Sequence, residues 1–153
     1  MVIGWNLTML EVTSDGCVYK GNTSLIHSAC PSHGSFIGWK ACRDGKIVKL
    51  EIPEEAKRCS GLGRKCRASK AKVLAIYGAM SDVPLDEEAR SGYDESFVYR
   101  VGDVVEPKEA FEENRFDECS SGIHFYLTRV EAELENVLKN LAQEEISKIE
   151  NLK

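Results

Sequence analysis

The alternation of apolar and polar residues predicts a β-hairpin in the first half of the chain. The segments 36–42 and 47–52 are both rich in apolar residues, and Asp44-Gly45 lies between them. An Asp-Gly pair between two such runs is a strong hairpin signal, because both residues accept the positive φ angles of a tight turn. In the second segment apolar residues alternate with a lysine and a glutamate, as in a strand with one buried face. The pattern therefore predicts two paired antiparallel strands.

Other short apolar runs predict the remaining strands. The almost continuous run Val73–Tyr77 is typical of a central strand. Residues 97–105 suggest a strand pair that turns near Gly102-Asp103, and 122–127 should form the last strand. The other expected features are a short strand at 17–19 between the turns 14–16 and 20–22, a short helical turn at 53–56, a loop around 60–63 and an exposed acidic loop at 79–96.

The C-terminal segment predicts a long amphipathic helix. Thr128 and Glu131 have the spacing of a capping box. At about 1.5 Å per residue, a helix of about 24 residues would be roughly 36 Å long, which is long for so small a domain. We therefore expect the helix to make the protein a homo-oligomer. Its apolar stripe consists of Val130, Leu134, Val137, Leu138, Leu141, Ile146, Ile149 and Leu152.

These elements predict a single α+β domain, mainly an antiparallel sheet built from hairpins, with a long C-terminal amphipathic helix. Its parts would be an irregular N-terminal lead (1–35), a β-rich core (36–127) and the helix (128–153). The 153 residues, 42% hydrophobic and 29% charged, are enough to bury a core. No segment has the apolar length of a membrane span, and the N-terminus lacks the basic region of a signal peptide. We therefore expect a cytoplasmic protein without membrane contact.

The six cysteines do not change this picture. They stand at 17, 30, 42, 59, 66 and 119, with irregular spacing. For a cytoplasmic chain of this size we expect reduced thiols packed as small apolar side chains.

Charge is distributed unevenly along the chain. The segment from Lys57 to Lys72 contains seven basic residues and no acidic one, while the formal net charge is −5. Subtracting those seven charges leaves −12 for the rest of the chain. A general DNA-binding protein is normally basic overall, so the pattern argues against that class and favours a localised anion site.

The residues predicted to bind this anion lie in a glycine-rich part of the basic segment. Glycines allow backbone N–H groups to approach an anion, and arginine offers a two-pronged donor. The glycine spacing matches neither a P-loop nor a dinucleotide fingerprint. Trp39 is the aromatic residue that we expect to stack on a nucleotide base. The alternative is a solvated basic loop that pairs with the acidic remainder of the chain. The predicted site consists of Gly61, Gly63, Arg64, Lys65, Arg67 and Trp39.

Several longer sequence segments resemble one uncharacterised domain family of phages and bacteria, whose members often lie on the C-terminal side of pentapeptide repeats. They lie at 36–40, 47–58, 63–67 with 71–74, and 113–119 running into 122–125. The resemblance covers roughly 36–132, although this chain has no pentapeptide array. It implies a phage or prophage accessory protein that acts in the bacterial host cytoplasm. It implies no catalytic residues.

Two alternatives use the cysteines and histidines. Cys30 with His33, and Cys119 with His124, have residue types that bind zinc, but neither half is a paired CxxC, so we expect no metal and no cofactor. Cys119 and His124 also have the residue types of a nucleophile and its base. That pattern is too common to predict an enzyme.

The sequence therefore favours a non-enzymatic binding protein for a phosphate-bearing small molecule, for instance a host nucleotide signal that it sequesters, or for an acidic protein surface. One alternative is an interaction module that acts through the C-terminal helix. The other is an enzyme that uses Cys119 and His124.

Overall fold

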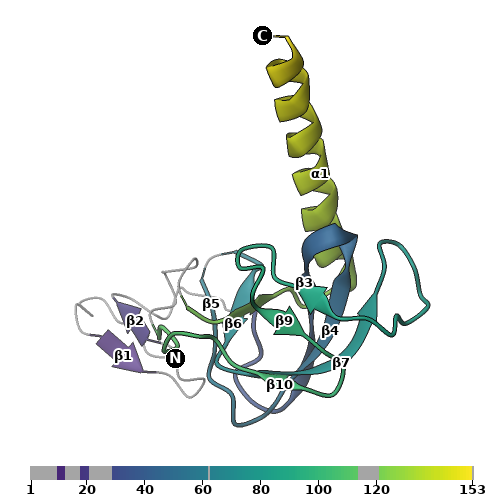
Figure 1. The fold of residues 1–153 in the computed structure, drawn as a ribbon. Helices are drawn as coiled ribbons and strands as arrows, with labels where there is room; N and C mark the ends of the chain where they lie inside the picture. The colour runs from purple at the N-terminus through teal and green to yellow at the C-terminus, as the bar shows by residue number, and fades with distance from the viewer. Residues whose placement is uncertain (1–9, 13–17, 21–28, 62, 114–120, 153) are drawn as a thin grey trace.

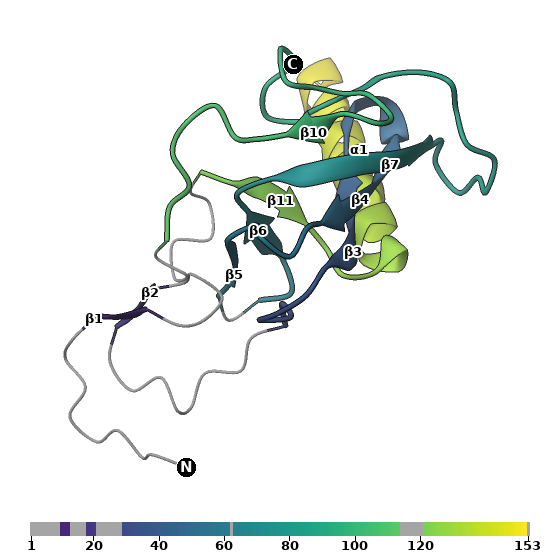
Figure 2. The same ribbon diagram turned by 90° about the horizontal axis from the view of Figure 1, so that it is seen from below.

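The computed structural model describes residues 10–12, 18–20, 29–61, 63–113 and 121–152. They form antiparallel sheets and a single C-terminal helix, which confirms the predicted α+β class. The central sheet has the order β10-β7-β4-β3, from the strands Val104–Val105, Ala71–Tyr77, Ile47–Ile52 and Phe36–Ala41 (Figure 2). The prediction of a central strand at Val73–Tyr77 is thus confirmed, and β7 begins two residues earlier.

The predicted hairpin is present as β3 and β4. Its register runs from Phe36 opposite Ile52 to Ala41 opposite Ile47. The turn (η2, Arg43–Gly45) contains Asp44 at φ 60° and Gly45 at φ 72°. These are the positive angles for which Asp-Gly is suited, so local sequence determines this turn.

A second sheet, of order β11-β6-β5, contains the basic segment. Its strands are Ile123–Phe125, Cys66–Ala68 and Arg58–Ser60. Much of the segment is therefore a hairpin whose strands are buried, while the turn around Gly63 and the lysines at the two ends of the segment, Lys57 and Lys72, are exposed. Just after β11, Tyr126 pairs with Trp39 of β3 through two backbone hydrogen bonds of 2.7 Å, which joins the two sheets. The predicted last strand is thus confirmed.

Two strand pairs complete the β structure. β1 (Leu10–Val12) pairs with β2 (Val18–Lys20), close to the strand predicted at 17–19; Cys17 and the turn at 14–16 lie outside the described residues. β8 (Ala89–Arg90) pairs with β9 (Val98–Tyr99).

Three local predictions were wrong. β9 and β10 do not pair with each other, because β10 and the turn at Gly102 form hydrogen bonds to β7 instead. The acidic segment 79–96 is not wholly exposed, since it contributes β8 and buries Ala89 and Ser91. Residues 53–56 form a turn closed by the hydrogen bond from Ala56 N to Pro53 O, not a helical turn.

The main core fills the space between the sheets. It includes Val48 and Leu50 of β4, Val73 and Ile76 of β7, and Phe125 of β11. At Gly38 of β3 a Cβ atom would lie 2.5 Å from the Phe125 ring, so the close approach of the strands requires glycine there. The other described residues of this cluster are Cys30, Cys42, Ile52, Ala56, Cys66, Ala68, Ala71, Ala89, Tyr99, Val105 and Ile123.

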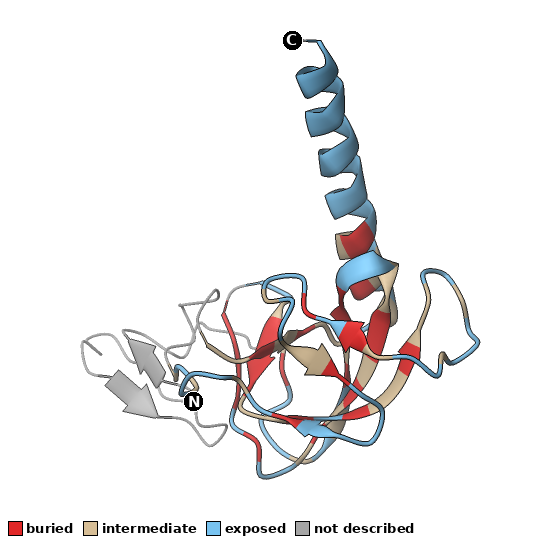
Figure 3. Cartoon of the chain, in the orientation of Figure 1, coloured by how far each residue is buried: buried red, intermediate tan, exposed pale blue. Residues whose placement is uncertain are grey.

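Helix α1 (Arg129–Asn151) begins at the predicted cap and then leaves the body of the protein (Figure 1). The Thr128 hydroxyl accepts from Glu131 N at 3.4 Å and donates to the Glu131 carboxylate at 2.7 Å. Ala132 and Asn136 are its only buried residues, and almost all of the helix beyond them is exposed (Figure 3). In the described part of the chain, no helix combines the length and apolar character needed to cross a bilayer.

Candidate ligand-binding site

Two of the predicted anion-binding residues contact the base of α1. Arg64 binds both carboxylate oxygens of Glu131, with Nε–Oε2 and Nη2–Oε1 distances of 3.0 and 2.9 Å. Lys65 Nζ lies 2.8 Å from Glu135 Oε1. Pairing between the basic segment and an acidic surface was the alternative left open by the sequence, and for these two residues the described partner is the helix. That they also bind a ligand stays a prediction.

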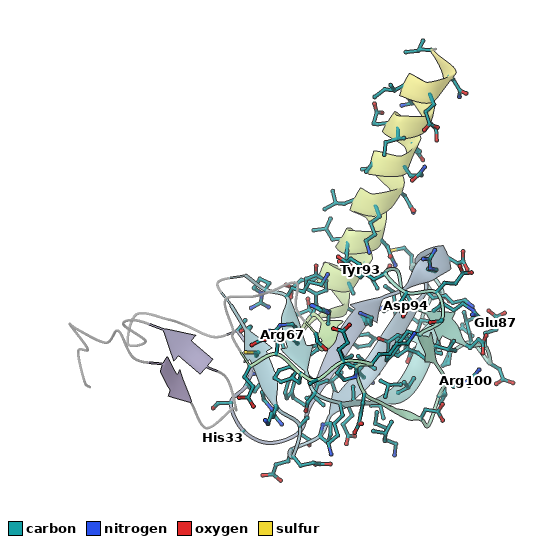
Figure 4. The ribbon with its side chains drawn as sticks, turned by 60° about the vertical axis from the view of Figure 1, so that its left-hand side comes forward. His33, Arg67, Glu87, Tyr93, Asp94 and Arg100 are labelled. Carbon is teal, nitrogen blue, oxygen red and sulfur yellow. The ribbon has the colours of Figure 1, made fainter. Side chains whose placement is uncertain are left out.

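Arg67 is buried, and its described contacts are with other parts of the protein. It is 2% exposed on β6, and its guanidinium donates to the carbonyls of Glu112 and Ser121 at 2.8 and 3.1 Å (Figure 4). It also lies over the Phe111 ring at 5.3 Å. These contacts join the segments on both sides of residues 114–120. Buried arginine with carbonyl partners contributes to packing as well as to hydrogen bonding.

Trp39 lies on the face of β3 that packs against α1. Its neighbours are Tyr77 at 6.2 Å between ring centroids, and the cations of Arg129 and Lys49 at 5.9 and 5.6 Å from its own ring. Lys40 follows directly in the strand and therefore points to the opposite face. Sequence reasoning selected Trp39 and missed Lys40.

A cavity of about 500 Å³ lies on the side of the sheet that Lys40 faces. This volume is in the usual range for small-molecule sites. Of the predicted set, Lys65 is the one residue that lines it. The other walls come from the β8–β9 segment, from the stretch after β10 and from β11. The lining residues are Lys40, Lys65, Ser91, Tyr93, Asp94, Phe97, Tyr99, Pro107, Lys108, Glu109, Ser121, Gly122, Ile123 and His124.

Lys40 is the buried cation of this cavity. It is 8% exposed, its Nζ donates to the His124 carbonyl at 3.1 Å, and it lies 5.9 Å from the centre of the Tyr99 ring. No carboxylate of the described residues lies within ion-pair distance of Nζ. Burial lowers the pKa of Lys40 from 10.5 to about 8. An amine that donates one hydrogen bond has further donors to offer an anion.

The other cations at the cavity have carboxylate partners. Lys65 lies between Glu135 and the rings of Tyr93 and Tyr126, at 5.8 and 5.7 Å. Burial alone would lower the pKa of Lys65, but the hydrogen bond and charge of Glu135 outweigh it and raise that pKa. Lys108 Nζ lies 2.6 Å from Asp94 Oδ2, and its hydrogen bond, with those from Ser96, holds the pKa of Asp94 at about 2.

Tyr93 and Asp94 stand on the loop between β8 and β9, close to the base of α1 (Figure 4). Tyr93 is 78% exposed, and Lys139 of α1 lies 5.7 Å from its ring centre. The cavity therefore combines a buried amine, apolar and aromatic walls, and a rim of paired charges. This arrangement suits a small molecule with one anionic group and a flat apolar part.

The described cysteines are divided between thiols and a disulfide. Cys30, Cys42 and Cys66 are buried and are not disulfide-bonded. Cys59 is disulfide-bonded, so the prediction that all cysteines are reduced was wrong for this residue. The physical reason is that a disulfide needs proximity in space, and irregular spacing along the chain cannot exclude that.

The metal and enzyme alternatives depend partly on residues that the structure does not describe. Within the described ranges, no three His, Cys, Asp or Glu side chains form a group that could hold a metal ion. Cys119 lies outside those ranges, so the expectation of no metal stays a prediction. His124 is half-buried on β11 and lines the cavity. Cys42 is a poor nucleophile, because burial raises its thiol pKa to about 11.

Comparison with known proteins gives one match. The model of DUF5758, described as a family of unknown function, matches residues 26–132. No curated protein and no solved structure matches the chain. The matched range includes every residue that lines the cavity and ends in the first turn of α1. By this match over most of its length, the chain belongs to the DUF5758 family.

Proposed function

We propose that this protein is a non-enzymatic binding protein that takes a small phosphate-bearing ligand into the cavity beside Lys40. The observation that carries the proposal is the buried amine of Lys40, which faces a cavity without a carboxylate partner among the described residues. Burying a charged group without an opposite charge is costly, and a bound anion would remove that cost.

The remaining walls support a ligand with an aromatic or other flat part. Phe97 and Tyr99 pack against each other with ring centroids 5.2 Å apart, and both line the cavity. Exposed Tyr93 stands at the rim and offers a ring face to an incoming base. A nucleotide has both required parts, a phosphate and a flat ring system, and about 500 Å³ accommodates a mononucleotide-sized molecule.

Lys65 connects this site with the basic segment. It lines the cavity while paired with Glu135, so an incoming phosphate would compete with that carboxylate for the ammonium group. We propose Lys40 as the principal anion-binding residue and Lys65 as the second. Arg64, Arg67, Gly61, Gly63 and Trp39 do not line the cavity, and a direct ligand contact from them stays a prediction.

Binding is proposed rather than catalysis because the thiol that the structure describes near Lys40 is not activated. The thiol nearest to Lys40 in sequence, Cys42, is held in its neutral form by burial. The resemblance to phage and bacterial proteins that often carry pentapeptide repeats supports an accessory role. Sequestration of a host nucleotide signal is the specific form of that role that we propose.

The test is calorimetry with purified full-length protein against a panel of mononucleotides, cyclic di- and oligonucleotides, ADP-ribose and inorganic phosphate. We expect at least one nucleotide to bind and to be recovered unchanged. Charge-assisted hydrogen bonds contribute about 1.5–3 kcal/mol, so Lys40→Met should weaken binding some ten-fold or more. Lys72→Met is the matched control, because Lys72 is an exposed lysine of the same sheet that does not line the cavity.

Two results would overturn the proposal. One is the absence of binding by every member of the panel. The other is binding that Lys40→Met and Lys72→Met weaken equally, provided that both variants keep the wild-type circular dichroism spectrum. Recovery of a chemically altered nucleotide would instead favour the enzyme alternative.

A further inference from the structure

Helix α1 exposes an apolar face on the side turned away from the body. Ala132 and Asn136 are buried against the body, whereas Val130 and Leu134 in the same two turns are 75% and 54% exposed. Residues two positions apart in a helix lie about 200° apart around its axis, so Ala132 and Leu134 are on opposite sides. Within the part of the chain that the structure describes, the apolar face is therefore not used for packing, even where the helix is docked.

This face continues to the end of the helix with a regular spacing. Val130, Leu141 and Leu152 are each separated by eleven residues, and so are Leu138 and Ile149. An eleven-residue repeat corresponds to about 3.67 residues per turn, which keeps such positions in line along a nearly straight helix. The α1 stripe, as we use the term below, consists of Val130, Leu134, Leu138, Leu141, Ile149 and Leu152, with exposed fractions from 52% to 86%.

The area of this face is that of an interface. With the flanking Val137 and Ile146, the residues of the α1 stripe are each 47% to 86% exposed, and full burial of such a face would supply roughly the 800 Å² that one partner contributes to a standard specific interface. A monomer rarely exposes so large a contiguous apolar patch. Figures 1 and 3 show the distal helix standing clear of the body, so that nothing in the described chain covers it.

We propose that the α1 stripe binds the same stripe of a second copy of this chain. An aliphatic row meets the requirement of a two-fold interface, because the same patch must be complementary to itself. Charge disfavours a membrane as the occupant: α1 contains six glutamates and three basic residues, whereas helices that lie on anionic membranes have basic polar faces. This inference concerns a different surface from the cavity and does not rest on the proposed ligand.

Two charged residues, Glu145 and Lys148, stand in the line of the stripe near its end. Glu145 lies eleven residues after Leu134, and its carboxylate is 2.8 Å from Lys148 Nζ of the same helix. In a pairing of two stripes this local ion pair would lie at the interface and weaken it, because charges are depleted from interface centres. Replacing both Glu145 and Lys148 by leucine should therefore strengthen the association, an effect that is expected only if the stripe is buried between two copies.

The experiment measures the mass of the purified full-length protein by light scattering across a wide range of concentrations, with native mass spectrometry for stoichiometry. We expect a dimer for the wild type, a monomer for Leu138→Glu/Leu141→Glu, and a dissociation constant at least ten-fold lower for Glu145→Leu/Lys148→Leu. Asn140→Glu/Gln143→Glu is the matched control, since it places two glutamates on exposed positions outside the stripe and should leave the dimer intact.

A wild-type protein that stays monomeric at high concentration overturns the proposal, whatever else it binds. An assembly that Leu138→Glu/Leu141→Glu leaves unchanged also overturns it. The substituted side chains lie outside the body, so thermal unfolding of the body should not change and serves as the folding control. Nucleotide binding by the monomeric variant should equal that of the wild type, which separates this test from that of the cavity.

Discussion

Lys65 Nζ in the turn before β6 lies 2.8 Å from Glu135 Oε1 on the second turn of α1, although the two residues are 70 positions apart in the chain. Glu135 also accepts from the Tyr126 hydroxyl at 3.4 Å and lies 3.6 Å from Lys139. The Glu135 carboxylate thus contacts the turn of the basic hairpin through Lys65, the residue that follows β11 through Tyr126, and the next turn of α1 through Lys139. It fixes the base of α1 beside the cavity.

We expect this pair to couple the stability of the helix base to the hairpin. In a double-mutant cycle with Lys65→Met and Glu135→Gln, the two side chains should show a coupling energy of about 1 kcal/mol, more than is usual for exposed pairs because both are half-buried. The free energies of unfolding of the four proteins in the cycle are measured by chemical denaturation. The surface pair of Lys70 with Glu55, at 3.3 Å and away from α1, is the control and should show a smaller coupling.

Arg67→Ala should strongly destabilise the protein, by about 3 kcal/mol. The substitution removes a buried guanidinium and leaves the carbonyls of Glu112 and Ser121 without these hydrogen bonds. Urea unfolding of the variant measures the loss. Arg64→Ala is the control, since Arg64 is exposed and should change stability little. Similar stabilities for the two variants would contradict the structural role that we assign to Arg67.

Local patterns predicted the elements whose structure depends on nearby residues. The Asp44-Gly45 turn and the Thr128 cap follow from side chains within a few positions of each other. The pairing of β8 with β9 and the attachment of β10 to β7 depend on segments that meet only after folding. The pattern of apolar residues could not decide between these pairings.

The candidate site was harder to predict for the same reason. In β3 the apolar Ile37 is 37% exposed while Lys40 is 8% exposed, the reverse of what hydrophobicity alone suggests. One signal was present in the sequence. Lys40 shares a strand face with Gly38 and Cys42, two small residues of types that commonly face a core. Basic residues at 64 and 65 and glutamates spaced four apart at 131 and 135 were also visible, but not their proximity.

Gly38→Ala should destabilise the protein by about 1–3 kcal/mol. The added Cβ would lie 2.5 Å from Cδ2 of the Phe125 ring, which joins the two sheets in the main core. A smaller side chain at 125 should relieve the conflict, so Gly38→Ala should cost less in a Phe125→Leu background than in the wild type. Denaturation midpoints of the four proteins decide this, and equal costs in both backgrounds would contradict the close approach.

The last prediction concerns the charge of Lys40. Its pKa in the folded protein is about 8, below the ordinary value of 10.5, so the unfolded chain binds this proton more tightly than the folded one. Lys40 therefore destabilises the fold below pH 8, and this effect is lost as the pH rises from about 8 to 10.5. The full shift corresponds to about 3 kcal/mol as an upper value.

Lys40→Met should accordingly stabilise the ligand-free protein at pH 7, and its advantage over wild type should decrease between pH 8 and 10.5. Cys42, Tyr99, Lys65, Glu135 and Lys139 interact with or surround Lys40 and are present in both proteins, so the difference between the two proteins reports on Lys40. Denaturant unfolding at pH 6, 7, 8, 9 and 10.5 measures this difference. If it does not change with pH, Lys40 titrates normally and is not the buried, unpaired amine on which the proposed ligand site depends.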